Sequence, residues 1–340
     1  MKSKFWMRAA LLAGLGCCLS RAAGIPHFNL DEAVNAADLI VVADVKQIRH
    51  LGPGEPIQFR DEMLQAEEYS ADLSVSRILK GPKLDEVSVR YALPLTPVGY
   101  RGLSRGIRMV FLRRDKNEYR LANPYYSNFP ATFESLGEGA SPETPSQLVL
   151  TNMLAVLASA STSSSDKYEI IRVDYALPKS EETITALRKG LSVSTDTGLS
   201  EKLQGELICV GDLSQLPGAA DLLLKNFATQ NGRDWLLYAI GNCVRNARAI
   251  PMLERLLSSP DNIVREAATQ ALWHIGTQAA VPALVQKLQD PDEKVLFYAV
   301  RGLSDIAGEY GWGGPSEREF HENQQKYVTH WQEWAKNRAQ

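Results

Sequence analysis

Apolar and polar residues alternate with a period of two in the first third of the chain. Ala71, Leu73 and Val75 alternate with Asp72 and Ser74, and the next apolar run repeats this alternation. The period predicts strands with one buried and one solvated face, which suits an antiparallel sheet or a small barrel. The predicted strands are Leu39–Ile48, Tyr69–Leu79, Asp85–Leu93, Gly106–Arg114 and Glu118–Tyr126. Five such strands indicate a small OB-like Greek-key barrel.

The segments between these strands carry helix and turn signals. Asn29 and Glu32 have capping-box spacing at the start of a short helix predicted over residues 29–38. Gly81-Pro82 breaks the chain between the second and third strands, because proline fixes φ and lacks a backbone donor. Residues 51–65 are rich in glycine and proline, so we expect a long, exposed loop there.

The last third of the chain repeats an apolar pattern at a fixed interval. Pro260-Asp261 recurs as Pro291-Asp292, and a weaker earlier copy covers residues 205–231. A period near 30 with small residues at helix contacts predicts a solenoid of stacked helical pairs. The apolar positions Val264, Ala268, Ala271, Leu272 and Ile275 recur 31 residues later as Val295, Ala299, Gly302, Leu303 and Ile306.

A capping helix is predicted after the repeats, because the open end of a solenoid has to be covered. Ser316 and Glu319 have capping-box spacing at its start. The helix carries an apolar stripe that either packs on the last repeat or forms an exposed binding face, and core packing is favoured. The stripe consists of Phe320, Tyr327, Trp331 and Trp334.

Two families resemble the two halves of the chain. The helical units resemble HEAT repeats, in the short form also found in phycobilisome lyases. The barrel segment, over roughly residues 37–125, contains the pattern Tyr69, Val75, Leu79, Lys80, Gly81, Tyr91, Pro94 and Met109–Leu112. In these residues it resembles the netrin-like OB domain shared with tissue inhibitors of metalloproteinases. Those inhibitors place an N-terminal cysteine on the protease zinc, whereas this chain has no cysteine between Leu19 and Ile208.

Residues 1–24 have the pattern of a signal peptide, with a basic start, a short apolar run and small residues at the cleavage site. Alternatives are an N-terminal anchor or lipidation at Cys17 or Cys18. Export predicts a periplasmic or secreted protein. For Cys209 and Cys243, the sequence leaves two states open: buried free thiols or a single disulfide, which an oxidising compartment permits.

Net charge limits the classes of partner. The whole chain has a net charge of −3, and removing residues 1–24 leaves 33 basic and 40 acidic side chains, a net charge of −7. This balance argues against general affinity for nucleic acid or anionic membranes. No later run is apolar enough to span a membrane.

Three patterns resemble catalytic or binding sites without the required context. Gly102–Gly106 matches G-x-S-x-G, but a nucleophile elbow needs a strand before Ser104 and a helix after it, whereas a proline-rich loop precedes it here and a strand is predicted to follow. The histidines show no i, i+4 pair for zinc, and a basic cluster suggests either an anionic partner or, preferably, a solvated strand face. The histidines are His27, His50, His274, His321 and His330, and the cluster is Arg101, Arg105, Arg108, Arg113, Arg114 and Lys116.

The sequence therefore predicts an α+β multidomain protein, a small antiparallel OB-like β-barrel followed by an α-solenoid of HEAT-like helical pairs. We expect a non-catalytic scaffold without cofactors or metals that binds another protein through the solenoid. The second helix of each pair is expected to line the concave face. Alternatives are a barrel-mediated inhibitor or regulator of an extracellular protease, a hydrolase using Ser104, or a lyase-like enzyme. The predicted partner contacts are Glu254, Arg255, Gln286 and Lys287. The predicted segments are signal peptide 1–24, barrel 25–136, linker with one apolar helix 137–166, solenoid 167–312 and capping helix 313–340.

Overall fold

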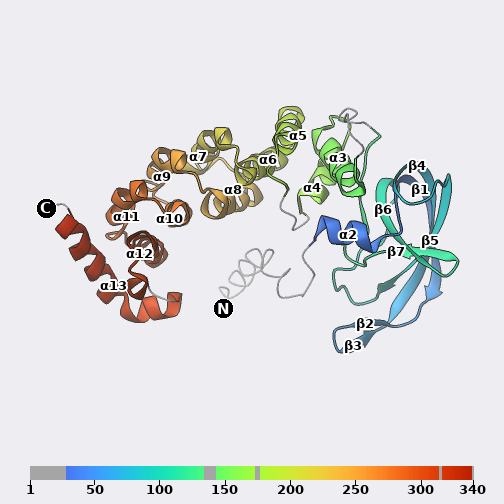
Figure 1. Cartoon of the computed structure of the whole chain (residues 1–340), viewed down its shortest axis with the longest axis horizontal. Coiled ribbons are helices and arrows are strands. Elements are labelled where there is room, and N and C mark those ends of the chain that lie inside the picture. Colours follow the sequence, from blue (N-terminus) through green and yellow to red (C-terminus); the bar gives the residue numbers. More distant parts are fainter. Residues whose placement is uncertain (1–27, 134–142, 173–176, 314–315, 339–340) are drawn as a thin grey trace, which may run out of the picture. The chain divides into compact units, whose positions relative to one another are not determined.

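The computed structural model describes residues 28–133, 143–172, 177–313 and 316–338 (Figure 1). The chain forms two compact units, Met1–Ala176 and Leu177–Gln340. The predicted signal peptide lies outside the described residues. The predicted solenoid start at residue 167 precedes the division between the units.

The first unit contains a closed five-stranded barrel. Its strands follow the order β1-β4-β5-β7-β6, and β6 pairs with β1 to close it. The short strand β8 (Asn128–Pro130) adds to β6. All five predicted strands are present, but the barrel is not wholly antiparallel, because β5 and β7 run parallel. The barrel strands are β1 (Leu39–Pro53), β4 (Ala66–Lys80), β5 (Glu86–Pro94), β6 (Gly106–Asp115) and β7 (Glu118–Leu121).

The first strand of the barrel, β1, is buried on both of its faces. Leu39, Val41 and Ala43 point into a core shared with Val89 and Val110. The alternate residues of β1 are equally buried, which explains why this strand is continuously apolar instead of alternating. Helices α2 (Leu30–Ala36) and α3 (Pro145–Ala158) pack on the barrel, and the Asn29 side chain caps α2 as predicted.

The segment Lys80-Gly81-Pro82 forms the turn at the end of β4. Lys80 Nζ donates to the carbonyls of Val34 (2.7 Å) and Ala37 (2.5 Å), which lie at the end of α2. Gly81 has a φ of +100°, and a Cβ there would lie 2.6 Å from the Asp38 carbonyl oxygen. The lysine therefore ties α2 to the barrel, and the turn requires glycine.

Two predictions for the first unit are wrong. Part of the expected loop over residues 51–65 is a hairpin of β2 (Ile57–Phe59) and β3 (Glu62–Leu64), and β1 itself extends to Pro53. The expected linker over residues 137–166 contains α3, at the place of the expected apolar helix, and the start of α4 (Ser164–Arg172), and these helices pack on strands β4 and β8 instead of forming a tether. Helix α3 is largely buried, which shows that this segment belongs to the domain core.

The second unit is an α-solenoid, as predicted. Long helices alternate with short ones from α6 to α12, and each long helix packs on the next. A three-residue 3-10 turn precedes each short helix. The helices are α5 (Glu181–Val193), α6 (Thr197–Val210), α7 (Leu216–Leu224), α8 (Gln230–Cys243), α9 (Ile250–Leu256), α10 (Asn262–Ile275), α11 (Val281–Lys287), α12 (Glu293–Ala307) and α13 (Glu317–Arg338).

The repeated polar residues are helix boundaries. Asp261 and Asp292 cap α10 and α12 through their side chains, and each short helix begins with proline near its first position. Gly276 and Gly308 end the long helices in the left-handed conformation. The Pro-Asp pairs and the prolines of the short helices therefore mark where helices start.

Helix α13 covers the last repeat. Phe320, Tyr327 and Trp331 are buried in the solenoid core, so the prediction of core packing is confirmed. Trp331 Nε1 donates to the Trp312 carbonyl at 2.9 Å. Across the described part of the chain, no helix combines the length and apolarity needed to cross a bilayer.

Candidate functional site

The long helices of the solenoid form one row and the short helices form a second row, and the two rows differ in spacing. Helices α6, α8, α10 and α12 pack directly on one another, whereas α9 and α11 make only marginal contact. Within this unit the long helices therefore lie on the inner side of the curve and the short ones on the outer side (Figure 1). Small residues such as Ala239, Ala268 and Gly302 are buried along the long helices and allow their close approach.

The four predicted partner contacts lie on the outer row. Glu254 and Arg255 belong to α9, and Gln286 and Lys287 belong to α11. The prediction that the second helix of each pair lines the inner face is wrong, because the sequence repeat does not show toward which helix row the array curves. Whether these residues bind a partner stays a prediction.

Two of these four residues have structural partners. Arg255 pairs with Asp221 at 2.9 Å. Lys287 Nζ donates to the Leu257 carbonyl at 2.8 Å and lies 3.3 Å from an Asp290 oxygen, and only 13% of its side chain is exposed. Lys287 therefore connects successive repeats and is poorly placed to reach a partner.

The long helices carry a stripe of partly exposed aromatic and polar side chains that sequence reasoning missed. They come from these helices at i, i+3, i+4 and i+7 spacing. This spacing in the first helix of each pair was the available signal. We call the following set the inner stripe: Lys202, Trp235, Tyr238, Asn242, Gln270, Trp273, Tyr298, Arg301 and Asp305.

The first half of the inner stripe is built on α6 and α8. Lys202 Nζ lies 3.8 Å from the centroid of the Trp235 ring, and Trp235 stacks on Tyr238 with centroids 5.1 Å apart. Tyr238 is 48% exposed. Gly205 makes room for the indole, since a Cβ there would lie 2.6 Å from Trp235 Nε1. Of the two stacked rings, Tyr238 is the exposed one, whereas Trp235 is half-buried between its neighbours.

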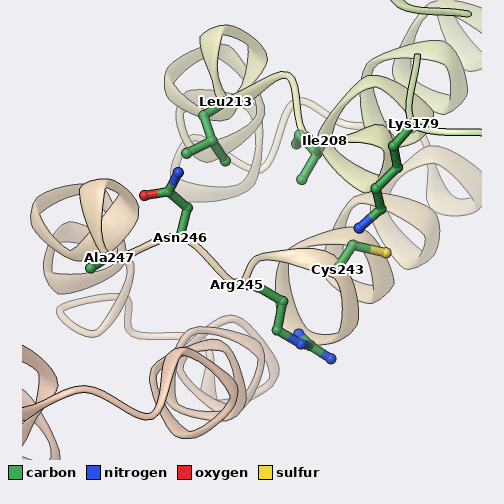
Figure 2. A pocket seen from close by; sticks show the side chains of 8 residues that line it. Lys179, Ile208, Leu213, Cys243, Arg245, Asn246 and Ala247 are labelled. Carbon is green, nitrogen blue, oxygen red and sulfur yellow. The ribbon is translucent and has the colours of Figure 1, made fainter.

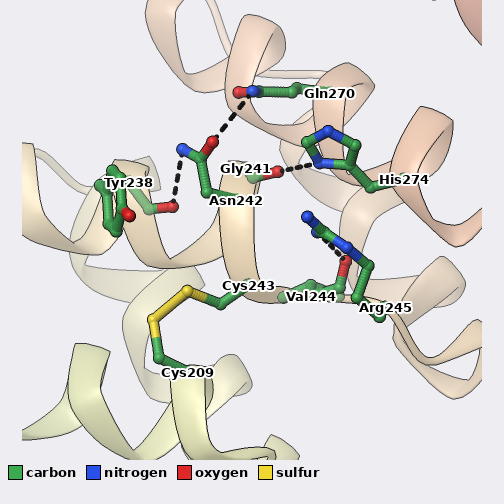
Figure 3. The surroundings of a disulfide bond; sticks show 9 residues. All are labelled: Cys209, Tyr238, Gly241, Asn242, Cys243, Val244, Arg245, Gln270 and His274. Carbon is green, nitrogen blue, oxygen red and sulfur yellow. Dashed lines mark hydrogen bonds between the residues drawn. A yellow bond between two sulfur atoms is a disulfide. The ribbon is translucent and has the colours of Figure 1, made fainter. Parts of the chain in front are cut away.

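The second half links α10 to α12. Trp273 stacks on Tyr298 with centroids 5.8 Å apart and donates from Nε1 to Asp305 at 2.6 Å. The Arg301 guanidinium lies 5.2 Å from the centroid of the Trp273 ring. Gln270 donates to Asn242 at 3.2 Å, which joins the two halves (Figure 3). The stripe therefore continues over consecutive helices.

Two titratable groups beside the inner stripe are perturbed. Burial raises the pKa of Glu206 to about 7, although the charge of Lys202 acts in the opposite direction. Burial also lowers the pKa of His274, and the charge of Arg245 lowers it further, while a hydrogen bond to the Gly241 carbonyl acts against both. His274 is therefore neutral at pH 7.

A disulfide joins Cys209 of α6 to Cys243 of α8 (Figure 3). The Cα atoms are 4.8 Å apart, and both residues lie near the ends of their helices. Of the two states that the sequence left open, the structure has the disulfide. The bond fixes the spacing of the first two long helices beside the inner stripe.

Two adjoining clefts open near this disulfide, at the turns that follow α6 and α8. The first, about 400 Å³, is lined by Lys179, Cys243 and Arg245 among others (Figure 2). The second, about 450 Å³, includes Arg248 and Met252.

The remaining candidates for chemistry are distributed without a catalytic arrangement. Ser104 is exposed in a loop and strand β6 follows it, as predicted, so the elbow context is missing. His321 pairs with Glu293 and His330 with Glu309. Within the described ranges, no group of three or more metal-ligating side chains could hold an ion. His27 lies outside those ranges.

The predicted basic cluster has partly structural roles. Arg108 pairs with Glu169 of α4 at 2.9 Å, and Arg101 lies 3.6 Å from the same carboxylate. These two arginines hold α4 on the barrel, which the solvated-face interpretation did not anticipate.

A family model for HEAT repeats matches residues 249–311, which cover α9 to α12. The comparison with curated proteins gives no match. The HEAT match agrees with the observed helical pairs, and it extends over the part of the chain where the 31-residue interval is clearest.

Proposed function

We propose that this protein is an exported, non-catalytic scaffold that holds another protein on the inner stripe of its solenoid. HEAT repeats commonly mediate protein interactions, and solenoids offer extended concave surfaces. The observation that carries the proposal is the row of partly exposed Trp, Tyr and Arg side chains on successive long helices. These residue types dominate binding energy at protein interfaces.

The remaining features of the proposal rest on the sequence. Export to the periplasm or the outside follows from the pattern of residues 1–24 and agrees with the disulfide, which oxidising compartments favour. We propose a netrin-like relation for the barrel and a phycobilisome-lyase type for the repeats. The net negative charge favours a protein partner over nucleic acid.

The test compares partner recovery by the full-length protein and by matched variants. Crosslinked complexes are purified from the producing cell with Tyr238→Ala/Trp273→Ala as the inner-stripe variant and Glu254→Ala/Gln286→Ala as the outer-row control. The proposal expects the first variant to lose the partner and the second to retain it. Equal recovery by both variants would contradict it, and loss only in the control would support the outer row. Thermal unfolding measured by circular dichroism establishes that each variant is folded.

A further inference from the structure

The two clefts at the turns after α6 and α8 form one groove. They share the lining residues Gly211, Leu213 and Asn246, so they adjoin each other and are treated together as one groove. Apolar side chains, including Ile208 and Met252, line the groove. We call this continuous surface the turn groove. It lies at the helix ends of the first repeats and is separate from the inner stripe.

The charges along the turn groove all have one sign. Lys179, Arg245 and Arg248 line it, and no carboxylate appears among the described residues that line either cleft. In the described part of the chain, none of the three side chains is paired with an acid. Arg245 donates only to the neighbouring Val244 carbonyl, at 3.0 Å. The turn groove therefore carries positive charge that no described side chain neutralises.

Other arginines of the solenoid, in contrast, form ion pairs with aspartates. Arg188 pairs with Asp212 at 2.8 Å, Arg255 with Asp221, and the buried Arg265 with Asp290 at 2.8 Å. Partial burial lowers the pKa of Arg245, and no carboxylate of the described residues acts in the opposite direction. In a net acidic chain, a local group of unpaired cations over an apolar surface is selective for an acidic ligand.

We propose that the turn groove binds an acidic linear peptide, with an apolar side chain against Leu213 and Ile208 and carboxylates on Lys179, Arg245 and Arg248. Charge complementarity carries this choice of occupant. The disulfide supports it, because Cys243 lines the groove and its bond to Cys209 fixes two of the helices that form its walls. The proposal goes beyond the inner stripe and shares with the proposed function only the premise that the partner is a protein.

The probe is a fluorescein-labelled peptide of eight alternating Glu and Leu residues, with matched Gln–Leu and Lys–Leu peptides. Fluorescence anisotropy with the full-length, oxidised protein is expected to show binding of the Glu–Leu peptide at least about tenfold tighter than either control peptide. The affinity is expected to fall between low and high salt, because exposed charges are screened.

Two variants locate the binding. Lys179→Gln/Arg245→Gln is expected to weaken binding by about tenfold or more, while the control Arg318→Gln, an exposed arginine of α13, leaves it unchanged. The inner-stripe variant Tyr238→Ala/Trp273→Ala is expected to bind the peptide normally, so failure of the scaffold proposal and failure of this one are distinguishable. Equal binding of the three peptides, no effect of the double Gln variant, or no binding at about 100 μM would overturn the inference.

Discussion

Replacing Cys209 and Cys243 together by serine is expected to destabilise the solenoid by about 2–4 kcal/mol. The cysteines are separated by 34 residues. In the chain-entropy model, closing a loop of this length removes unfolded-state freedom equivalent to about 4 kcal/mol. Helices α6 and α8 also pack directly on each other, so the native contact survives the substitution and the loss arises mainly in the unfolded chain.

Urea unfolding followed by tryptophan fluorescence measures this effect selectively. All tryptophans except Trp6 lie in the second unit, so the emission reports on the solenoid. With a denaturant slope of about 2 kcal/mol/M, the midpoint of the double Ser variant is expected about 1–2 M below that of the oxidised wild type. Wild-type protein treated with a dithiol reductant is expected to unfold at the midpoint of the variant.

The reasoning would be refuted by an oxidised wild type whose midpoint lies within about 0.3 M of the double variant. A reduced wild type that unfolds well above the double variant would instead show that serine disturbs the site directly. Mass spectrometry after alkylation establishes the redox state of each sample.

Three further predictions concern buried groups of the solenoid. Arg265→Met is expected to cost about 3–5 kcal/mol, because it leaves the buried Asp290 carboxylate without its bidentate partner. Gly205→Ala is expected to cost about 1–3 kcal/mol and to shift the emission of the solenoid, because a Cβ would collide with Trp235. Glu206, whose pKa burial raises to about 7, keeps its proton in the folded state at pH values where the unfolded chain loses it, so solenoid stability is expected to fall as the pH rises from about 5 to 7. Glu206→Gln is expected to remove this fall and to stabilise the protein at pH 8 by about 2–3 kcal/mol.

Matched substitutions control these three measurements by urea unfolding. Arg255→Met breaks an exposed pair and is expected to cost at most about 1 kcal/mol, so equal losses in the two arginine variants would contradict the role of burial. Gly218→Ala meets only the flexible end of Gln204, and a loss as large as that of Gly205→Ala would argue against the collision. For Glu206, pH profiles that coincide in the wild type and the Gln variant would show that this carboxyl does not titrate differently on folding.

Much of the fold could be predicted because its signals are local. Period-two alternation located the barrel strands, and the Asp and Pro residues that recur at a fixed interval located the helix starts. The β2–β3 hairpin was missed, because glycine and proline around residues 51–65 indicate turns without showing that a short strand pair lies between them. Helix α3 was taken for part of a linker, because its serine-rich neighbours resemble tethers while its burial depends on the barrel beneath it.

The face that carries the candidate site could not be predicted from the repeat alone. A repeat shows which positions are apolar, but the direction of curvature depends on which helix row packs more closely. In this chain the long helices approach each other through small residues, and large side chains lie beside these contacts and bridge neighbouring long helices. The Trp235 ring packs on Gly205 of α6, and Trp273 of α10 stacks on Tyr298 of α12. The same helical period therefore places small residues where the long helices touch and aromatic rings beside those contacts. The inner stripe should consequently lose partner affinity when a ring is removed, and lose its geometry when a small core residue such as Ala268 is enlarged.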